Sequence, residues 1–260
     1  WISFLGCFSG ILRNMEAPWD IVDLGGYTGY NFLKKKKKNK LCPSGPTVYR
    51  NYIWSAMIKS IEALGFKIEF YFDEGTYPIE EELNTEDKMR VLRLKNWVRD
   101  QLKQTNNPVV VWGVPIPEFA IINGVDGDYY KCSTFRNSVG AREEPIHYEN
   151  LQAPGGLWSY SITSDGSKNW QTHSEERDHR TIQQGISFTK HHKAVDGYIM
   201  GVNAYEEWAS NLEYLGKTES DYHGNSYVGE CLLEQRRNLL AFLQRMFERH
   251  KETNFAQYLK

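Results

Sequence analysis

The segment from Pro117 to Asp128 reads Pro-Glu-Phe-Ala-Ile-Ile-Asn-Gly-Val-Asp-Gly-Asp and carries the strongest signal for the fold of this chain. Its apolar middle predicts a β-strand, and the Asp-Gly pair near its end is typical of a tight turn between antiparallel strands. Tyr129 to Cys132 then begins the return strand. One carboxylate, Glu118, stands at the mouth of this otherwise apolar strand. The stretch therefore predicts a hairpin whose first strand begins at a single ionisable side chain.

The segments on either side of this hairpin predict both strands and helices. Apolar runs or alternation predict further strands at residues 27–33, 66–72, 109–112 and 157–162. Apolar residues three or four apart predict helices at residues 2–15, 18–24, 48–64, 85–103, 178–192, 203–214 and 227–250. The order of helices, then strands, then helices favours the α+β class. We expect an α+β core over residues 1–165 and a helical C-terminal extension over residues 166–260, packed on the core.

Composition narrows the classes of function. The 260 residues are 40% hydrophobic and 25% charged, with a net charge of -2, so no overall positive field favours nucleic acid or an anionic membrane. Residues 1–12 are apolar but broken by Ser and Gly, and they are shorter than the ~20 residues needed to span a bilayer. The four cysteines are scattered, which fits a reducing compartment. We expect a cytoplasmic protein with no nucleic-acid or membrane partner.

Two local features stand out before the hairpin. Five lysines run from Lys34 to Lys38, and like charges in a row are typical of a solvated loop or strand edge, although a site for an anionic partner is the alternative. The segment from Cys42 to Thr47 reads Cys-Pro-Ser-Gly-Pro-Thr and predicts a rigid turn.

Two side chains are candidates for chemistry. Cys7 lies early in the first predicted helix, where the helix dipole can lower a thiol pKa, although a buried structural cysteine fits the same pattern. Glu118 is a candidate acid or base if desolvated, and it is equally compatible with orienting a substrate amine or pairing with a lysine. His147, in a loop-rich segment, is the one histidine that we consider as a base. The cysteine and histidine spacing contains no metal-binding motif, and we expect no cofactor.

Several short motifs resemble one known family. They are Gly6-Cys7 in a first helix, the segment from Tyr27 to Phe32, the turn from Cys42 to Thr47, and Ile116-Pro117-Glu118-Phe119. Together they resemble the bacterial relatives of butirosin-biosynthesis protein H, whose N-terminal domain is similar to bacteriocin-processing cysteine peptidases. The segments 203–208, 224–227 and 234–237 resemble the helical tail of the same family.

The resemblance implies a papain-like α+β core with a thiol centre. Cys7 matches the nucleophile position, and Glu118 stands where the family has its catalytic histidine. The third, acidic position falls near Ser133 or Thr134, and neither is acidic. The implied catalytic residues are therefore Cys7 and Glu118. The implied substrate-binding residues are Trp112, Phe119 and Tyr30.

Two main functions follow from this resemblance. The first is a cysteine-centred acyltransferase or amide hydrolase that acts on a small-molecule, peptide or acyl-carrier substrate. The second is a catalytically inactive papain-fold protein that binds a ligand. A partner-binding role for the helical tail is a third hypothesis.

Overall fold

The computed structural model describes residues 2–37, 41, 52–74, 82–164, 173–190, 197–214 and 218–255. Within these ranges the chain forms seven α-helices and an antiparallel sheet of six strands, so the expected α+β class is confirmed. No helix in the same ranges is both long and apolar enough to cross a bilayer.

The chain divides into two compact units. The sheet unit comprises Ser3–Pro18 and Gly65–Trp170, and the helical unit comprises Trp1–Ile2, Trp19–Leu64 and Gln171–Lys260. This division differs from the expected ranges of 1–165 and 166–260, because residues 19–64 group with the C-terminal helices. The contacts of α2 (Ile21–Tyr27) with α8 (Glu219–His250) account for that grouping.

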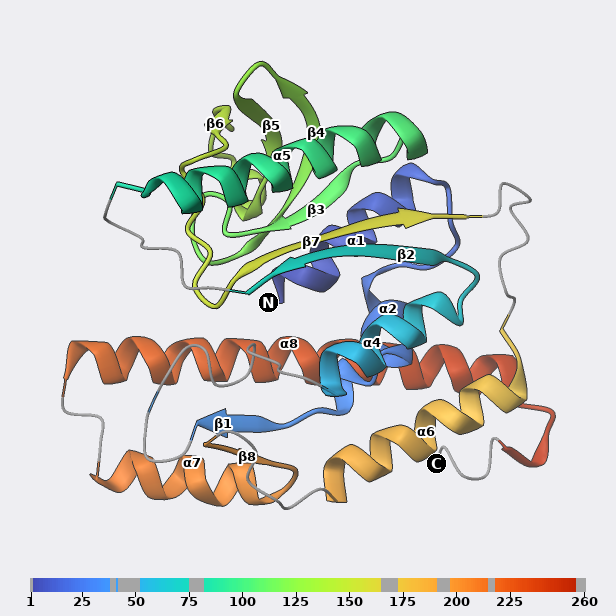
Figure 1. The fold of residues 1–260 in the computed structure, drawn as a ribbon. Coiled ribbons are helices and arrows are strands. Elements are labelled where there is room, and N and C mark those ends of the chain that lie inside the picture. The colour runs from blue at the N-terminus through green and yellow to red at the C-terminus, as the bar shows by residue number, and fades with distance from the viewer. Residues whose placement is uncertain are drawn as a thin grey trace. The chain divides into compact units, whose positions relative to one another are not determined.

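The sheet unit contains the six-stranded sheet (Figure 1). Its strands lie in the order β2 (Lys67–Asp73), β7 (Leu157–Thr163), β3 (Val109–Trp112), β4 (Phe119–Asp126), β5 (Tyr129–Ser133) and β6 (Ile146–His147). The hairpin predicted from the sequence is β4 and β5, and Gly127 takes a positive φ of 57° in its turn. The pairing of β4 with β5 shifts register between Ile122 and Gly124.

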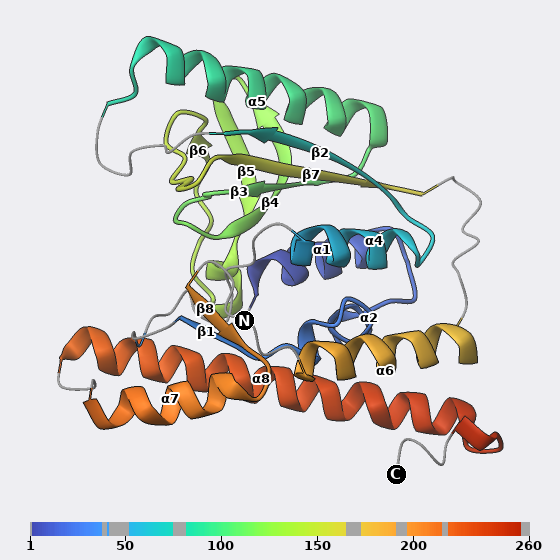
Figure 2. The same cartoon turned by 60° about the horizontal axis from the view of Figure 1, so that its bottom comes forward.

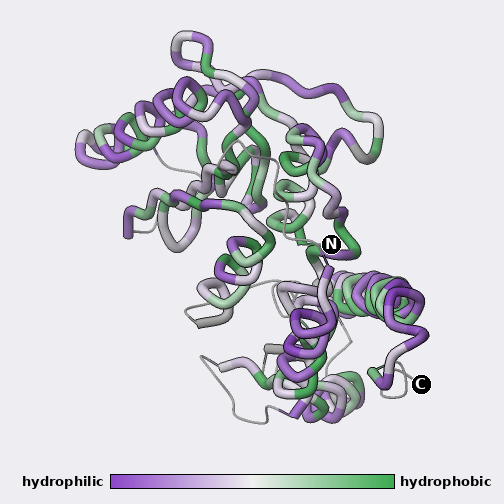
Figure 3. The backbone as a smooth tube through the Cα atoms, turned by 90° about the vertical axis from the view of Figure 1, so that its right-hand side faces the viewer, coloured by the Kyte–Doolittle hydropathy of each residue, from purple (hydrophilic) through white to green (hydrophobic). Residues whose placement is uncertain are grey.

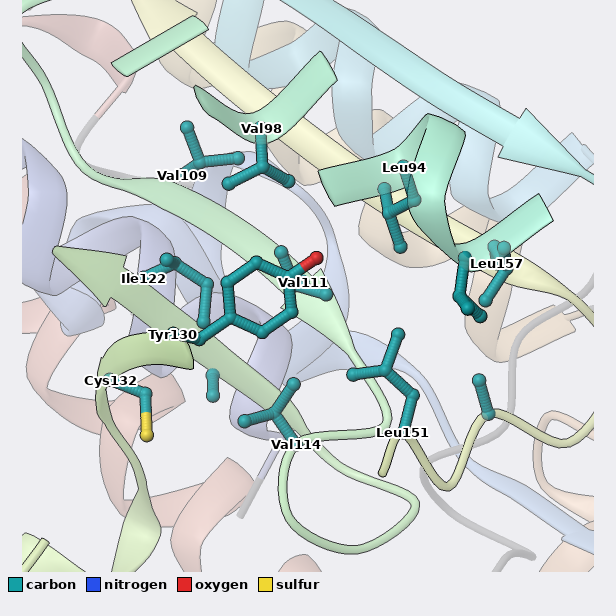
Figure 4. Packing of buried hydrophobic residues seen from close by; sticks show 13 residues of the cluster. Leu94, Val98, Val109, Val111, Val114, Ile122, Tyr130, Cys132, Leu151 and Leu157 are labelled. Carbon is teal, nitrogen blue, oxygen red and sulfur yellow. The ribbon is translucent and has the colours of Figure 1, made fainter. Parts of the chain in front are cut away.

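Helices cover both faces of this sheet (Figure 2). On one face, α5 (Thr85–Thr105) buries Val91, Leu94 and Val98 against the strands. Figure 4 shows Leu94 and Val98 on the side of α5 that faces Val109, Val111 and Tyr130. On the other face, α1 (Ser3–Asn14) packs on β3 and β4. The residues Val109 to Val111 of β3 are fully buried, which explains why this strand is a continuous apolar run.

The helical unit is organised around α8, which has 32 residues. Its buried residues recur every three to seven positions and form one stripe, as expected of a helix with one covered side: Val228, Cys231, Gln235, Phe242, Met246 and His250. Figure 3 shows the resulting alternation of hydrophobic and hydrophilic residues along the helices. The other elements are η1 (Tyr30–Phe32), α4 (Tyr52–Glu62), α6 (Glu175–Lys190) and α7 (Asn203–Tyr214), with β1 (Lys35–Lys37) paired antiparallel to β8 (Tyr198–Met200).

Some predicted elements are wrong. The segment 27–33 is not a strand, because α2 continues to Tyr27 and Gly29 then adopts a left-handed φ of 78° that starts the short helix η1. The helix predicted over 227–250 starts earlier than expected, because α8 begins at Glu219 and runs through Gly224. The alternating pattern of residues 66–72 predicts that the phenylalanine side chains on one face are buried. This prediction is only partly right, since Phe70 remains 67% exposed.

The lysine run differs most from its prediction. Lys34 and Lys35 are buried, although the run was expected to be solvated. Packing decides the outcome here, because the strand β1 pairs with β8 and tertiary contacts override the preference of like charges for solvent. Lys38 and the turn predicted from Cys42 to Thr47 lie outside the described residues.

The packing of α2 on α8 leads to a matched pair of substitutions. A Cβ atom at Gly26 would lie 2.4 Å from the ring of Phe242, whereas a Cβ atom at Gly229 meets nothing within 4 Å. We expect Gly26→Ala to lower the free energy of unfolding by ~1–3 kcal/mol through overpacking. Gly229→Ala, in the same helical unit, should raise it by ~0.5–1 kcal/mol through helix propensity. Urea denaturation of the two variants measures both effects, and equal stabilities would contradict the described α2–α8 packing.

Candidate functional site

The sheet unit brings the two predicted catalytic residues into electrostatic contact. Cys7 lies one helical turn after Ser3 on α1, and Glu118 directly precedes β4. The Ser3 hydroxyl oxygen accepts the backbone N–H of Phe119 at 3.0 Å, and the Ser3 side chain hydrogen-bonds the Glu118 carboxylate. Ser3 was not predicted as a site residue, and it fixes the start of β4 against α1.

The electrostatics of this pair oppose thiol activation. Cys7 is only 7% exposed, and burial raises the pKa of its thiol far above the ordinary value. The negative charge of Glu118 raises the pKa of Cys7 further. Cys7 is the fifth residue of α1, so it lies beyond the first turn, where the helix dipole acts most strongly. The thiol is therefore protonated near neutral pH, contrary to the activation expected from the sequence.

Glu118 is itself shifted toward its neutral form. Burial raises the pKa of the Glu118 carboxyl, and the hydrogen bond from Ser3 opposes that shift. A thiolate at Cys7 and a carboxylate at Glu118 would both be poorly hydrated in this buried site. The apolar surroundings therefore disfavour the presence of both anions side by side.

The predicted substrate-binding residues divide between the two units. Trp112 and Phe119 lie together in the sheet unit with ring centroids 4.9 Å apart, and the Trp112 indole donates to the Pro154 carbonyl at 3.2 Å. Phe119 is buried against Phe4 of α1, at 5.3 Å between centroids, so it serves the packing. Tyr30 belongs to the helical unit and is buried there.

A carboxylate lies beside Thr134, near which the family resemblance predicts an acidic residue. The Glu143 side chain accepts the Thr134 backbone N–H at 2.6 Å and the Thr134 hydroxyl at 3.2 Å. Sequence reasoning missed Glu143 because it lies nine residues away along the chain. His147, the candidate base, lies on the edge strand β6 and packs its ring 5.3 Å from that of Tyr129.

A second cluster of polar groups lies inside the helical unit, around Asp178. This residue is fully buried, and its carboxylate accepts the Tyr27 hydroxyl at 2.7 Å, His250 Nε2 at 2.8 Å and Arg249 Nη2 at 2.9 Å. Its partners come from α2 and α8, far away in sequence, so no local pattern predicts the cluster. The one local signal is spacing, because Asp178, Thr181 and Gly185 form the buried stripe of α6.

The cluster orients His173. Tyr27 donates its single hydroxyl hydrogen to Asp178, so the 2.7 Å contact between the Tyr27 oxygen and His173 Nδ1 requires a proton on Nδ1. Partial desolvation and the charge of Arg249 lower the pKa of His173 to about 4, although the residue keeps an exposed side. The imidazole is therefore neutral near pH 7, with Nε2 as a hydrogen-bond acceptor. Burial and the Asp178 carboxylate raise the pKa of Tyr27, so the phenol keeps its proton.

A cavity of about 380 Å³ lies beside Tyr27. Ala63 and Leu64, which follow α4, give it an apolar side, and α6 gives it a polar side with Arg177, Arg180 and Gln184. Arg180 pairs with Glu176 on the same helix. The cavity falls in the size range of small-molecule sites. Among the described residues no group of His, Cys, Asp and Glu side chains is arranged to hold a metal ion.

Comparison with known proteins gives no relative. No protein-family model matches the chain, and no curated protein sequence matches it. The resemblance to the relatives of butirosin-biosynthesis protein H therefore stays a prediction from short motifs.

The low pKa of His173 predicts a pH dependence of stability. Between its ordinary pKa of 6.5 and its folded value of about 4, the unfolded chain binds a proton at this site that the folded chain does not. The free energy of unfolding should thus fall as the pH is lowered through this window. We expect a shallower fall in His173→Gln, measured by urea denaturation at several pH values. Parallel pH profiles for the two proteins would contradict the neutral, oriented imidazole.

Proposed function

We propose that this protein has a papain-like core, binds a small ligand, and does not use Cys7 as a nucleophile near neutral pH. The observation that carries the proposal is the burial of Cys7, at 7% exposure, beside Glu118, because burial and the Glu118 charge both raise the pKa of the thiol. A cysteine nucleophile reacts as the thiolate, and enzymes that use one lower its pKa with a nearby cation or helix N-terminus. The arrangement around Cys7 has the opposite effect.

The papain-like part of the proposal rests on how α1 meets the sheet. A helix that carries a cysteine packs on an antiparallel sheet beside the first residue of a hairpin strand, as the family resemblance implies. Glu118 occupies the strand mouth, where a histidine would be needed as the base. The core then serves as a scaffold, and fold likeness alone gives no activity.

The cavity beside Tyr27 is our candidate for the ligand. It combines an apolar side from Ala63 and Leu64 with the guanidinium and amide groups of α6. Glu176 also lines the cavity and pairs with Arg180, so the site suits a small organic molecule with an apolar body and a polar end.

The second candidate function is cysteine-centred acyl transfer or amide hydrolysis. The observation in its favour is that Cys7 and Glu118, 111 positions apart in the printed sequence, interact electrostatically. In this function Glu118 accepts the thiol proton when a small-molecule, peptide or acyl-carrier substrate is bound. Its raised pKa makes Glu118 a stronger base than an ordinary glutamate.

The two functions predict opposite effects of one substitution. We expect iodoacetamide to alkylate Cys7 slowly at neutral pH and faster in Glu118→Gln, because the substitution removes a negative charge that disfavours the thiolate. If Glu118 is the base that activates Cys7, Glu118→Gln must slow the alkylation. The rate is measured on the Cys7 peptide by mass spectrometry across pH.

Cys132 is the matched control in the same molecule. It is also buried in the sheet unit, and burial and the Glu143 charge raise its pKa to about 11. Its rate should be the same in both proteins, which excludes a general loosening of the fold. Slower alkylation of Cys7 in Glu118→Gln, with Cys132 unchanged, would overturn the proposed function in favour of the thiol enzyme.

A further inference from the structure

Lys34 is a buried lysine whose ammonium group has no polar partner among the residues that the structure describes. The residue is 5% exposed, and in the described part of the chain its ammonium nitrogen has neither a hydrogen bond nor an ion pair. Its nitrogen lies 4.1 Å from the centroid of the Tyr205 ring and 4.9 Å from that of the Trp208 ring. Buried lysines normally pair with a carboxylate, so this environment is unusual.

The two rings around Lys34 are held in place by α8. Tyr205 and Trp208 are three residues apart on α7 and so lie on the same side of that helix. The Trp208 indole donates to Asn225 Oδ1 at 2.8 Å, and Arg236 donates to the Tyr205 hydroxyl at 3.2 Å. These elements all belong to the helical unit. The two rings thus form a fixed aromatic site around the amine.

The charges around Lys34 favour its neutral form. Burial lowers the pKa of Lys34 to about 7, and the nearby Arg236 guanidinium acts in the same direction. Cys231, also on α8, acts in the opposite direction. The two ring faces attract an ammonium, but this attraction is smaller than the cost of removing the ion from water.

Lys95 in the sheet unit has the opposite environment. It is also buried, at 8% exposure, and its nitrogen also lies over an aromatic ring, 4.5 Å from the centroid of Tyr148. However, Lys95 pairs with the Asp128 carboxylate at 2.5 Å, whereas Lys34 has the Arg236 cation nearby. Burial and an aromatic face are common to both lysines, so the charged neighbour is what distinguishes Lys34.

We propose that Lys34 is a nucleophilic amine that forms an imine with a small aldehyde or ketone. A lysine becomes a nucleophile when it is desolvated or placed near another cation, and Lys34 has both features. The nitrogen lone pair attacks the carbonyl carbon, and the carbonyl π electrons move to the oxygen. A first proton passes from nitrogen to that oxygen and gives a carbinolamine. The nitrogen then loses its second proton to the leaving hydroxyl, so the C–O bond breaks, water leaves and the C=N bond forms. Tyr205 is partly exposed, so the site is open to solvent along that ring.

This inference goes beyond the proposed binding function and does not involve Cys7. The test treats the intact chain with acetaldehyde and sodium cyanoborohydride at pH 7 for short times, and follows each lysine by peptide mass spectrometry. We expect Lys34 to be alkylated more than about tenfold faster than Lys95, since a drop of one unit in the pKa of Lys34 raises its neutral fraction about tenfold and Lys95 is held in an ion pair with Asp128. Lys34 should also react faster than Lys67, whose side chain is 71% exposed.

Two controls distinguish the intrinsic reactivity of the Lys34 amine from its accessibility to the aldehyde. In the urea-unfolded chain the three lysines should react at equal rates. Arg236→Gln removes the neighbouring cation and should slow Lys34 without changing Lys95. A rate at Lys34 equal to or below that of Lys95 in the folded chain would overturn the proposal. Such a rate would mean that the Lys34 amine is either charged or inaccessible to the aldehyde. An unchanged Lys34 rate in Arg236→Gln would also contradict the proposal.

Discussion

The packing of α1 on the sheet is the contact on which the account of the sheet unit depends. Phe4 and Phe8 of α1 lie against Tyr160 of β7, with ring centroids 5.3 Å and 6.0 Å apart, and Phe4 also meets Phe119. This aromatic layer fixes the helix over β4, and Ser3 then bonds the first backbone N–H of that strand. As a consequence, Cys7 and Glu118 share one apolar environment. The packing that assembles the pair is also what removes water from it.

Desolvation acts in opposite ways on acids and bases, and both effects occur in this chain. Burial raises the pKa of Cys7 and Glu118 in the sheet unit, and it lowers the pKa of His173 and Lys34 in the helical unit. In each case burial favours the neutral form of the group over its charged form. A neutral thiol is a poor nucleophile, whereas a neutral amine is a good one. Among these four groups, the nucleophile expected near pH 7 is therefore Lys34, and Cys7 is expected to be structural.

The sheet unit could largely be predicted from sequence because its signals are local. The hairpin at Gly127, the apolar run of β3 and the long helix α5 each follow from residues next to one another in the chain. The proximity of Cys7 and Glu118 followed from a family resemblance, since no local pattern joins residues so far apart.

The helical unit was predicted less well because its decisive contacts are between distant segments. Tyr27 and Asp178 meet across 151 positions, and the identity of either residue alone indicates nothing about the other. Lys34 shows the same limit. A run of five lysines predicts exposure, yet the pairing of β1 with β8 and the rings of α7 bury its first member. A local run of like charges indicates only that the side chains favour solvent. Whether a given lysine is exposed in the folded chain is decided by tertiary packing.

The most direct test of this account is a titration of the Cys7 thiol in the intact protein. Cysteine labelled with carbon-13 at Cβ reports thiol ionisation by NMR, and Cys7→Ser assigns the resonance. We expect that the Cys7 signal does not titrate up to about pH 9, above the ordinary thiol pKa of ~8.5. A titration midpoint below pH 7 would contradict it, because it would mean that the folded chain stabilises the thiolate beside Glu118.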